Sequence, residues 1–224
     1  MCGFESHLSQ CFNNPHLRYT LIMREERAEG IVLKTFDYKE NERIITIFTP
    51  EEGVITLIVK HIKNQNKIAL TTPFCQAEFL FIKGKSDLFK LQDGTILNDH
   101  HFLRASLAHI QAAAEMVKLI LKSQLPGKPA PKLYALLLAY LSHLPHFEDT
   151  SSLIGSFYLK LLTHEGLLSW ESSPVFPFQV TDIEWDVLKQ LALTRSFKEM
   201  QTVVLNPELY DRLKNKLALC FVGS

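Results

Sequence analysis

The sequence has no apolar run long enough to cross a membrane, no paired cysteines and no net charge. Its longest apolar run, residues 133–141, falls far short of the roughly 20 residues that a membrane helix requires. Its four cysteines lie apart without a C-x-x-C pair, which excludes a disulfide framework or zinc-finger pattern and fits a reducing cytoplasm. Because 24 basic residues balance 24 acidic ones, any attraction to nucleic acid must come from local charge asymmetry.

One such asymmetry is a long stretch without carboxylates. No Asp or Glu occurs between Glu52 and Glu78, and this stretch carries Lys60, Lys63 and Lys67. A polar loop with lysines and no acids suits a phosphate backbone, because each phosphate meets a cation without neighbouring repulsion. An ordinary solvated loop is the alternative interpretation.

The first part of the chain has the pattern of β-structure. Short runs rich in apolar and β-branched residues predict five strands, at residues 29–36, 42–49, 54–60, 74–83 and 87–93. Gly53 suits the positive φ of a hairpin turn, and Cys75 is predicted to be a small buried hydrophobe. Several strands are apolar on both faces, which favours a closed barrel of the OB-fold type.

After residue 98 the period changes to that of helices. Apolar residues at spacings of three and four predict one face of a long amphipathic helix, formed by Leu103, Leu107, Ile110, Ala114, Val117 and Leu121. The almost wholly apolar segment 133–144 predicts a helix at the centre of a helical domain. Further helices are predicted at residues 149–164, 181–193 and 207–219.

Capping residues mark the ends of these later helices. Residues 149–152 offer N-cap candidates, and Gly166 a C-terminal stop. Thr181 and Glu184 form a capping-box pattern, and Asn206 precedes a first-turn proline.

Taken together, these patterns predict an α+β protein with a barrel followed by an all-helical domain. The expected boundaries are an extension at residues 1–22, an OB-fold barrel at 23–100 and a helical domain at 101–224. Met23 directly precedes the regular strand pattern, so it is the expected true start of translation.

The stretch from residue 29 to 60 resembles the N-terminal barrel of the RecO family of bacterial recombinational-repair proteins. The resemblance rests on a G-x-V-L-K strand, a D-Y-x-E-x-x-R connection, a T-x-F-T-x-x-x-G hairpin and a basic strand end, at residues 30–34, 37–43, 46–53 and 60. A later hairpin, residues 78–88, is similar to the family's E-F-x-x-x-x-G-x-S-D-L pattern. The helical part is similar only in order and in segment 157–166.

The resemblance implies a recombination mediator without a cofactor. Family members bind single- and double-stranded DNA, anneal complementary strands, and work with RecR to load RecA onto strands coated by single-strand-binding protein. Such a protein would be cytoplasmic and associated with the nucleoid when acting. An adaptor that tethers repair partners with little DNA affinity is the alternative. The sequence contains no phosphate-binding glycine loop and no G-x-S-x-G motif, so an enzyme is not expected.

The candidate DNA-binding residues are the cations on and beside the predicted barrel strands. They are Lys34, Arg43, Lys60, Lys63, Lys67, Lys83 and Lys85. Arg43 has an alternative role, since it could pair with Glu40 or Glu42. Tyr38 is the candidate for stacking on unpaired bases. Phe36 and Phe81 are weaker candidates, because aromatics at strand spacing also suit a core.

Two expectations concern the helical part. Many RecO-family members carry two C-x-x-C pairs that bind a structural zinc, and the matching segment here, residues 167–179, has no cysteine, so no metal is expected. Trp170, Phe176 and Phe178 could replace that metal by apolar packing. The resemblance also implies a groove for the C-terminal tail of single-strand-binding protein. Leu133, Leu137 and Tyr140 with Lys132 or Lys160 could form it, or could simply be helical core.

Overall fold

The structure, a computed structural model, describes residues 24–170 and 179–220, with side chains to residue 215. It divides into two compact units. One comprises Met1–Ile47 with Ile55–Asp99, and the other comprises Phe48–Val54 with His100–Ser224.

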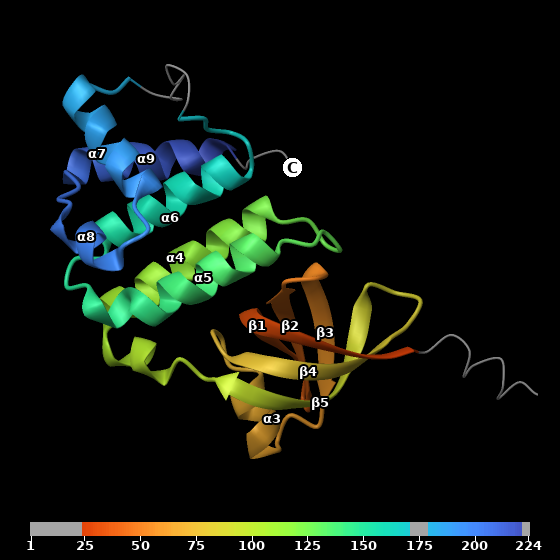
Figure 1. Cartoon of the computed structure of the whole chain (residues 1–224). Helices are drawn as coiled ribbons and strands as arrows, with labels where there is room; N and C mark the ends of the chain where they lie inside the picture. Colours follow the sequence, from red (N-terminus) through yellow and green to blue (C-terminus); the bar gives the residue numbers. More distant parts are fainter. Residues whose placement is uncertain (1–23, 171–178, 221–224) are drawn as a thin grey trace, which may run out of the picture. The chain divides into compact units, whose positions relative to one another are not determined.

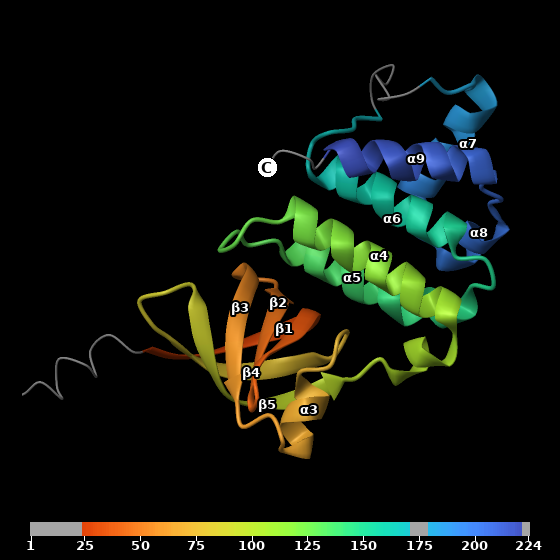
Figure 2. The ribbon, with the colours of Figure 1, turned by 180° about the vertical axis from the view of Figure 1, so that it is seen from behind.

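The first unit is built on a closed barrel whose strand order is β1-β2-β3-β5-β4 (Figures 1 and 2). The strands are β1 (Arg24–Lys39), β2 (Glu42–Thr49), β3 (Gly53–Lys60), β4 (Gln76–Lys83) and β5 (Leu88–Asn98), and a short helix, α3 (Gln65–Leu70), joins β3 to β4. An antiparallel β1–β4 pairing, from Arg24↔Lys83 to Ile31↔Gln76, and a parallel β3–β5 pairing complete the closure. The predicted OB-type α+β fold is confirmed.

Side-chain alternation fills the barrel. Successive strand residues point to opposite faces, so every second residue enters the core, as do Ile45 and Ile47 on β2 and Phe79 and Phe81 on β4. Cys75 is fully buried, as predicted. Because buried residues alternate with more exposed ones along these strands, the sequence pattern was sufficient to predict them.

Two strands and one connection differ from the prediction. β1 is sixteen residues long and starts at Arg24, and β5 extends to Asn98. The connection between β3 and β4 contains α3, which was not predicted. Asn64 caps this helix, since its side-chain oxygen accepts a hydrogen bond from the backbone N–H of Asn66 at 2.9 Å. Leu70 at its end is buried in the barrel core.

The second unit consists of helices. They are η1 (His101–Ala105), α4 (Leu107–Ser123), α5 (Pro131–His143), η2 (Leu144–His146), α6 (Ser151–His164), α7 (Asp182–Leu193), α8 (Phe197–Thr202) and α9 (Pro207–Cys220). Its most buried helix is α6, in which ten of fourteen residues are buried. The prediction that segment 133–144 is central was therefore wrong, because α6 contacts α4, α5, α7, α8 and α9.

The buried face of α4 also differs from the predicted stripe. Leu107 is 71% exposed, and Ala114 is exposed as well. The helix buries Val117 of the predicted stripe, but its buried face also includes Ala112, Ala113 and Met116. The prediction missed this part of the face because alanines carry little periodic signal.

The predicted helix ends agree with the structure. The N-cap of α6 is Thr150, within the predicted range, and its side chain makes no capping bond; Asp149 before it accepts hydrogen bonds from the backbone and hydroxyl of Ser151. Gly166 adopts a φ of 72° after the end of α6. Thr181 and Glu184 form the capping box of α7. Gly53 likewise has a positive φ of 64°.

A buried polar chain connects α5, α6 and α7. The Ser156 hydroxyl donates to the carbonyl oxygen of Leu191 at 2.6 Å. Since its one hydrogen is used there, it accepts from the Tyr140 hydroxyl at 2.8 Å. Burial raises the pKa of Tyr140 far above its usual range, which keeps this donor protonated. Each of these groups therefore depends on the others for a partner.

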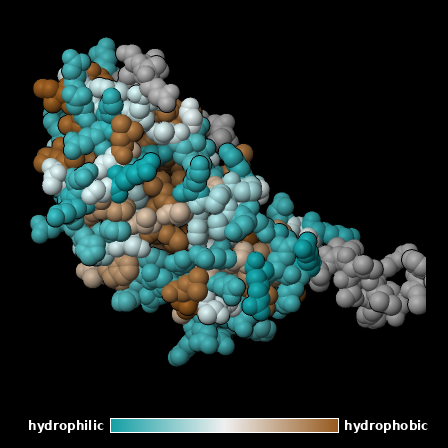
Figure 3. All heavy atoms as spheres, viewed as in Figure 1, coloured by the Kyte–Doolittle hydropathy of each residue, from teal (hydrophilic) through white to brown (hydrophobic). Residues whose placement is uncertain are grey.

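Hydrophilic residues predominate on the face drawn in Figure 3, and apolar ones gather over parts of the helical unit. Among the helices of the described residues, none combines the length and the apolar character needed to cross a membrane.

We expect Ser156→Ala to lower the free energy of unfolding by about 1–3 kcal/mol, because Leu191 and Tyr140 would each lose a buried partner. Urea unfolding followed by tryptophan fluorescence measures the loss. Ser142→Ala is the matched control, since the Ser142 hydroxyl is exposed and donates to Leu138 within the same helix; its effect should stay within about 0.5 kcal/mol. Equal losses for the two variants would contradict the prediction.

Candidate nucleic-acid interface

The last part of β1 exposes two aromatic rings between lysines. Lys34, Phe36 and Tyr38 alternate along the strand and so lie on one face. Phe36 is 44% exposed and Tyr38 is 52% exposed. The Lys34 ammonium lies 6.0 Å from the centroid of the Phe36 ring, and that of Lys39 lies 5.2 Å from the centroid of Tyr38. We call these four residues the aromatic strip.

A cluster of lysines adjoins the strip where the β1–β2 turn meets the end of β3. The backbone N–H of Ile62 donates to the carbonyl oxygen of Asn41 at 3.3 Å, which joins the two segments. Lys39 and Lys60 both reach the carboxylate of Glu42, at 3.7 and 3.5 Å. We call Lys39, Lys60, Lys63 and Lys67 the lysine end.

Local backbone geometry explains this clustering. His61 has a φ of 58°, which turns the chain out of β3 and toward α3. The Lys67 ammonium then reaches back from α3 to the carbonyl oxygen of Lys60 at 3.0 Å. Lys63, between them, is exposed and forms no ion pair within the described residues. Residues 60–67 of the carboxylate-free stretch therefore form a compact cationic corner instead of an extended loop.

Arg43 is held within the barrel unit. Its guanidinium donates to Asp37 at 2.8 Å and to the hydroxyl of Thr71 at 3.1 Å, and only 20% of its side chain is exposed. Its carboxylate partner is thus Asp37, and neither Glu40 nor Glu42. This geometry gives Arg43 the role of joining β1, β2 and the end of α3.

The remaining two predicted cations lie elsewhere on the barrel. Lys83 ends β4, pairs in register with Arg24, and its ammonium contacts Glu26 at 2.6 Å. Lys85 is exposed in the β4–β5 loop. This loop and α3 lie at different sides of the barrel (Figures 1 and 2). The structure therefore brings Lys34, Tyr38, Lys60, Lys63 and Lys67 to one region and leaves Lys83 and Lys85 outside it.

Burial distinguishes the aromatic candidates for base stacking from one another. Phe81 is fully buried and stacks on Phe89 with centroids 5.8 Å apart, so it is a core residue. Phe36 is exposed beside Tyr38, which makes it a stronger candidate than the sequence indicated. Lys39 was missed, although the alternating pattern from Lys34 to Tyr38, followed at once by a lysine, could have indicated it.

In the helical unit, the residues expected to form a groove are mostly core. Leu133 and Leu137 are fully buried and Tyr140 is 2% exposed. Lys160 donates to the carbonyl oxygens of Ala192 and Thr194, at 2.8 and 2.6 Å, and so caps the end of α7. Burial, with a smaller contribution from Arg195, lowers the pKa of Lys160.

A cavity of about 320 Å³ nevertheless opens beside these residues. Apolar and aromatic side chains line it together with two cations, and the lining residues are Leu136, Ala139, Tyr140, Lys160, Thr194, Arg195, Phe197 and Met200. The cavity therefore combines apolar walls with two cationic side chains.

Within residues 24–170 and 179–220, no group of three His, Cys, Asp or Glu side chains is placed to hold a metal. His143 stacks on Phe197 with ring centroids 3.8 Å apart. Trp170 stacks on Trp185 at 4.8 Å, whereas the predicted packing residues Phe176 and Phe178 lie outside the described residues.

Comparison with known proteins agrees with this architecture. Residues 23–100 match the family model "Recombination protein O N terminal". The chain is 34% identical over 143 residues to the DNA repair protein RecO of Bacillus pumilus, 31% over 142 residues to that of Syntrophomonas wolfei and 32% over 143 residues to that of Bacillus subtilis. These matches cover 62–63% of this chain and 56% of each relative, so the chain matches only a little over half of their length.

The fold defines the protein as an OB-type barrel followed by a helical unit. Through residues 23–100 the chain is similar to the N-terminal part of the RecO proteins.

We expect Arg43→Met to act on stability. It should lower the free energy of unfolding by about 1 kcal/mol, because Thr71 loses a donor while the exposed Asp37 is resolvated. Arg27→Met is the control, since its pairing with Glu78 at 3.8 Å is exposed and should contribute almost nothing. Chemical denaturation of both variants tests this, and equal stability of Arg43→Met and the wild type would contradict it.

Proposed function

We propose that the chain acts in DNA repair and recombination by binding DNA on its barrel unit. The supporting observation is the aromatic strip joined to the lysine end through Lys39. Cations that follow a phosphate backbone, combined with exposed rings on which bases stack, are the usual means of binding single strands on OB folds. The similarity to proteins named DNA repair protein RecO supports the same function.

The two parts of the site would act on different parts of the nucleic acid. The lysine end would neutralise phosphates of single- or double-stranded DNA and release condensed counterions, without reading sequence. Phe36 and Tyr38 would stack only on unpaired bases, because bases within a duplex present no accessible ring face. This division favours single strands without excluding duplexes.

The proposed role is that of a mediator that performs no bond chemistry and uses no cofactor. By neutralising phosphates it would reduce repulsion between complementary strands and so help them anneal. The family resemblance supports cooperation with RecR in loading RecA onto strands coated by single-strand-binding protein. Binding energy alone would drive each step.

An adaptor function is the second candidate, and the 320 Å³ cavity of the helical unit favours it. An acidic, apolar peptide such as the C-terminal tail of single-strand-binding protein needs an apolar interior beside cations. Phe197 and Met200 supply the first requirement, and Arg195 and Lys160 the second. In this alternative, partners are tethered while the barrel has little DNA affinity.

We expect Lys60→Gln/Lys63→Gln to weaken binding of a labelled single-stranded oligonucleotide. The logarithm of the binding constant falls with the logarithm of the salt concentration. For the variant, this slope should become shallower by up to about 0.7 for each phosphate that is no longer neutralised. Fluorescence anisotropy at several salt concentrations measures both effects. Lys189→Gln/Lys198→Gln, which removes two exposed cations from α7 and α8, is the matched control.

Two further outcomes separate the alternatives. Loss of binding only in Lys83→Gln/Lys85→Gln would move the DNA site to the β4–β5 loop. Binding of the tail peptide by a folded wild-type protein that binds no DNA would favour the adaptor.

For the aromatic strip, we expect Phe36→Ala and Tyr38→Ala each to weaken single-strand binding by about 1–3 kcal/mol. Duplex affinity should change little, since stacking needs unpaired bases. Parallel titrations with a single strand and its duplex measure the difference. Tyr38→Phe keeps the ring and should behave as wild type. Equal losses with both substrates would show that the rings do not stack on bases.

A further inference from the structure

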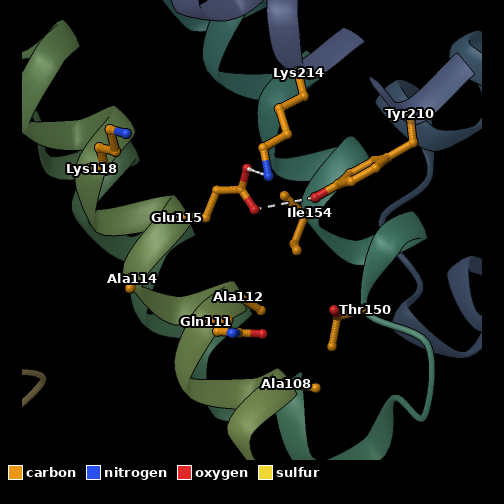
Figure 4. Close-up of a pocket in the computed structure, with 10 residues that line it drawn as sticks. All are labelled: Ala108, Gln111, Ala112, Ala114, Glu115, Lys118, Thr150, Ile154, Tyr210 and Lys214. Carbon is orange, nitrogen blue, oxygen red and sulfur yellow. Dashed lines mark hydrogen bonds and ion pairs between the residues drawn. The ribbon is translucent and has the colours of Figure 1, made fainter. Parts of the chain in front are cut away.

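A second cationic surface lies on the helical unit. A cavity of about 620 Å³ opens between α4 and α9, over the start of α6. Figure 4 shows Glu115 on α4 reaching toward Tyr210 and Lys214 on α9, with Ile154 of α6 beside them and Lys118 further along α4.

Small side chains create this hollow. Ala108, Ala112 and Ala114 contribute to the α4 wall, so this side of the helix fills little of the space. Thr150 and Ile154, at the beginning of α6, provide the rest of its lining here. The cavity is consequently a wide, solvent-open groove and does not enclose a small molecule.

A smaller hollow of about 70 Å³ continues the groove along α4. It shares Glu115, Lys118 and Lys214 with the first and adds Lys122 and Tyr158. Lys118 and Lys122 are one helical turn apart, which places their Cβ atoms about 5–6 Å from each other. Both side chains therefore leave α4 from the same face and line the smaller hollow.

Among the described residues, the one carboxylate that lines the two hollows is already engaged. Glu115 accepts from the Lys214 ammonium at 2.7 Å and from the Tyr210 hydroxyl at 3.2 Å. Burial first, and the Glu115 charge next, raise the pKa of Tyr210, so this hydroxyl remains a donor. Neither Lys118 nor Lys122 forms an ion pair with another described residue. The charges of Asp149 and Asp211 also act on Tyr210, so the excess of positive charge lies in the part of the groove beside Lys118 and Lys122.

We propose that this groove binds the phosphate backbone of a second DNA strand, apart from the strand on the barrel. An open, positively charged groove with successive lysines suits an extended polyanion. The Tyr210 hydroxyl is held by Glu115, and no other aromatic side chain of the described residues lines the larger hollow, so the contact is to phosphates and is independent of sequence. The inference rests on the proposed function. It adds a means by which one molecule brings two strands together.

The test measures two strands on one protein molecule. Donor-labelled oligothymidine is added at the concentration of the full-length protein, and acceptor-labelled oligothymidine, which cannot pair with it, is then titrated. Energy transfer between the two labels shows that one protein molecule holds both strands at once. If the acceptor strand merely replaces the donor strand on the protein, no transfer occurs. Light scattering confirms that every variant has the same association state.

We expect Lys118→Gln/Lys122→Gln to raise the acceptor concentration at half-maximal transfer roughly tenfold, because two phosphates would no longer be neutralised. Binding of the first strand should stay as in wild type. Lys189→Gln/Lys198→Gln is again the matched control and should leave both binding steps unchanged. Unaltered circular dichroism and melting temperature would show that the variants are folded.

The contrary outcomes are distinct. Wild-type transfer by Lys118→Gln/Lys122→Gln would overturn the inference, as would a wild-type protein that binds one strand and gives no transfer. Loss of acidic-peptide binding without loss of transfer in this variant would assign the groove to a protein partner and also overturn it. Failure of the wild type to bind even the first strand would instead refute the proposed function itself.

Discussion

The candidate interface of the barrel depends on one long strand, β1. Its first eight residues pair with β4 from Arg24 to Ile31 and so close the barrel. Its last residues, from Lys34 to Lys39, carry the aromatic strip and lead into the turn beside β3. Because one continuous strand performs both tasks, the pairing that closes the barrel also fixes the position of the exposed rings. A shift in register by one residue would turn Phe36 and Tyr38 to the opposite face.

Charge is distributed unevenly in a chain whose total charge is zero. At the lysine end, Lys39 and Lys60 share the carboxylate of Glu42, and in the helical unit three lysines line the two hollows together with Glu115. In both places this carboxylate is occupied by lysines, which leaves other cations accessible. A local excess of lysines over carboxylates therefore gives two regions suited to anions. The molecule as a whole, with a net charge of zero, would not attract DNA at long range.

The sequence predicted elements that depend on local pattern and missed those that depend on distant partners. β2 and the caps of α6 and α7 were predicted because alternation and capping residues are local signals. The start of β1 was missed because charged residues there become strand only by pairing with β4. The short helix α3 has too few residues for a periodic signal. Likewise, the site lysines were identified by composition, but the hydrogen bond from Arg43 to Thr71, 28 residues away, is a product of tertiary structure.

The pairing of Lys39 and Lys60 with Glu42 affects how the barrel would exchange ions with solvent. A phosphate that binds an unpaired lysine displaces ions from the DNA, and the salt slope counts those ions. A phosphate that binds Lys60 must in addition displace Glu42, whose carboxylate then takes up a cation from solution. That uptake opposes the release from DNA. The number of phosphates derived from the salt slope would therefore be smaller than the number in contact, with Glu42 acting as an internal competitor for the site.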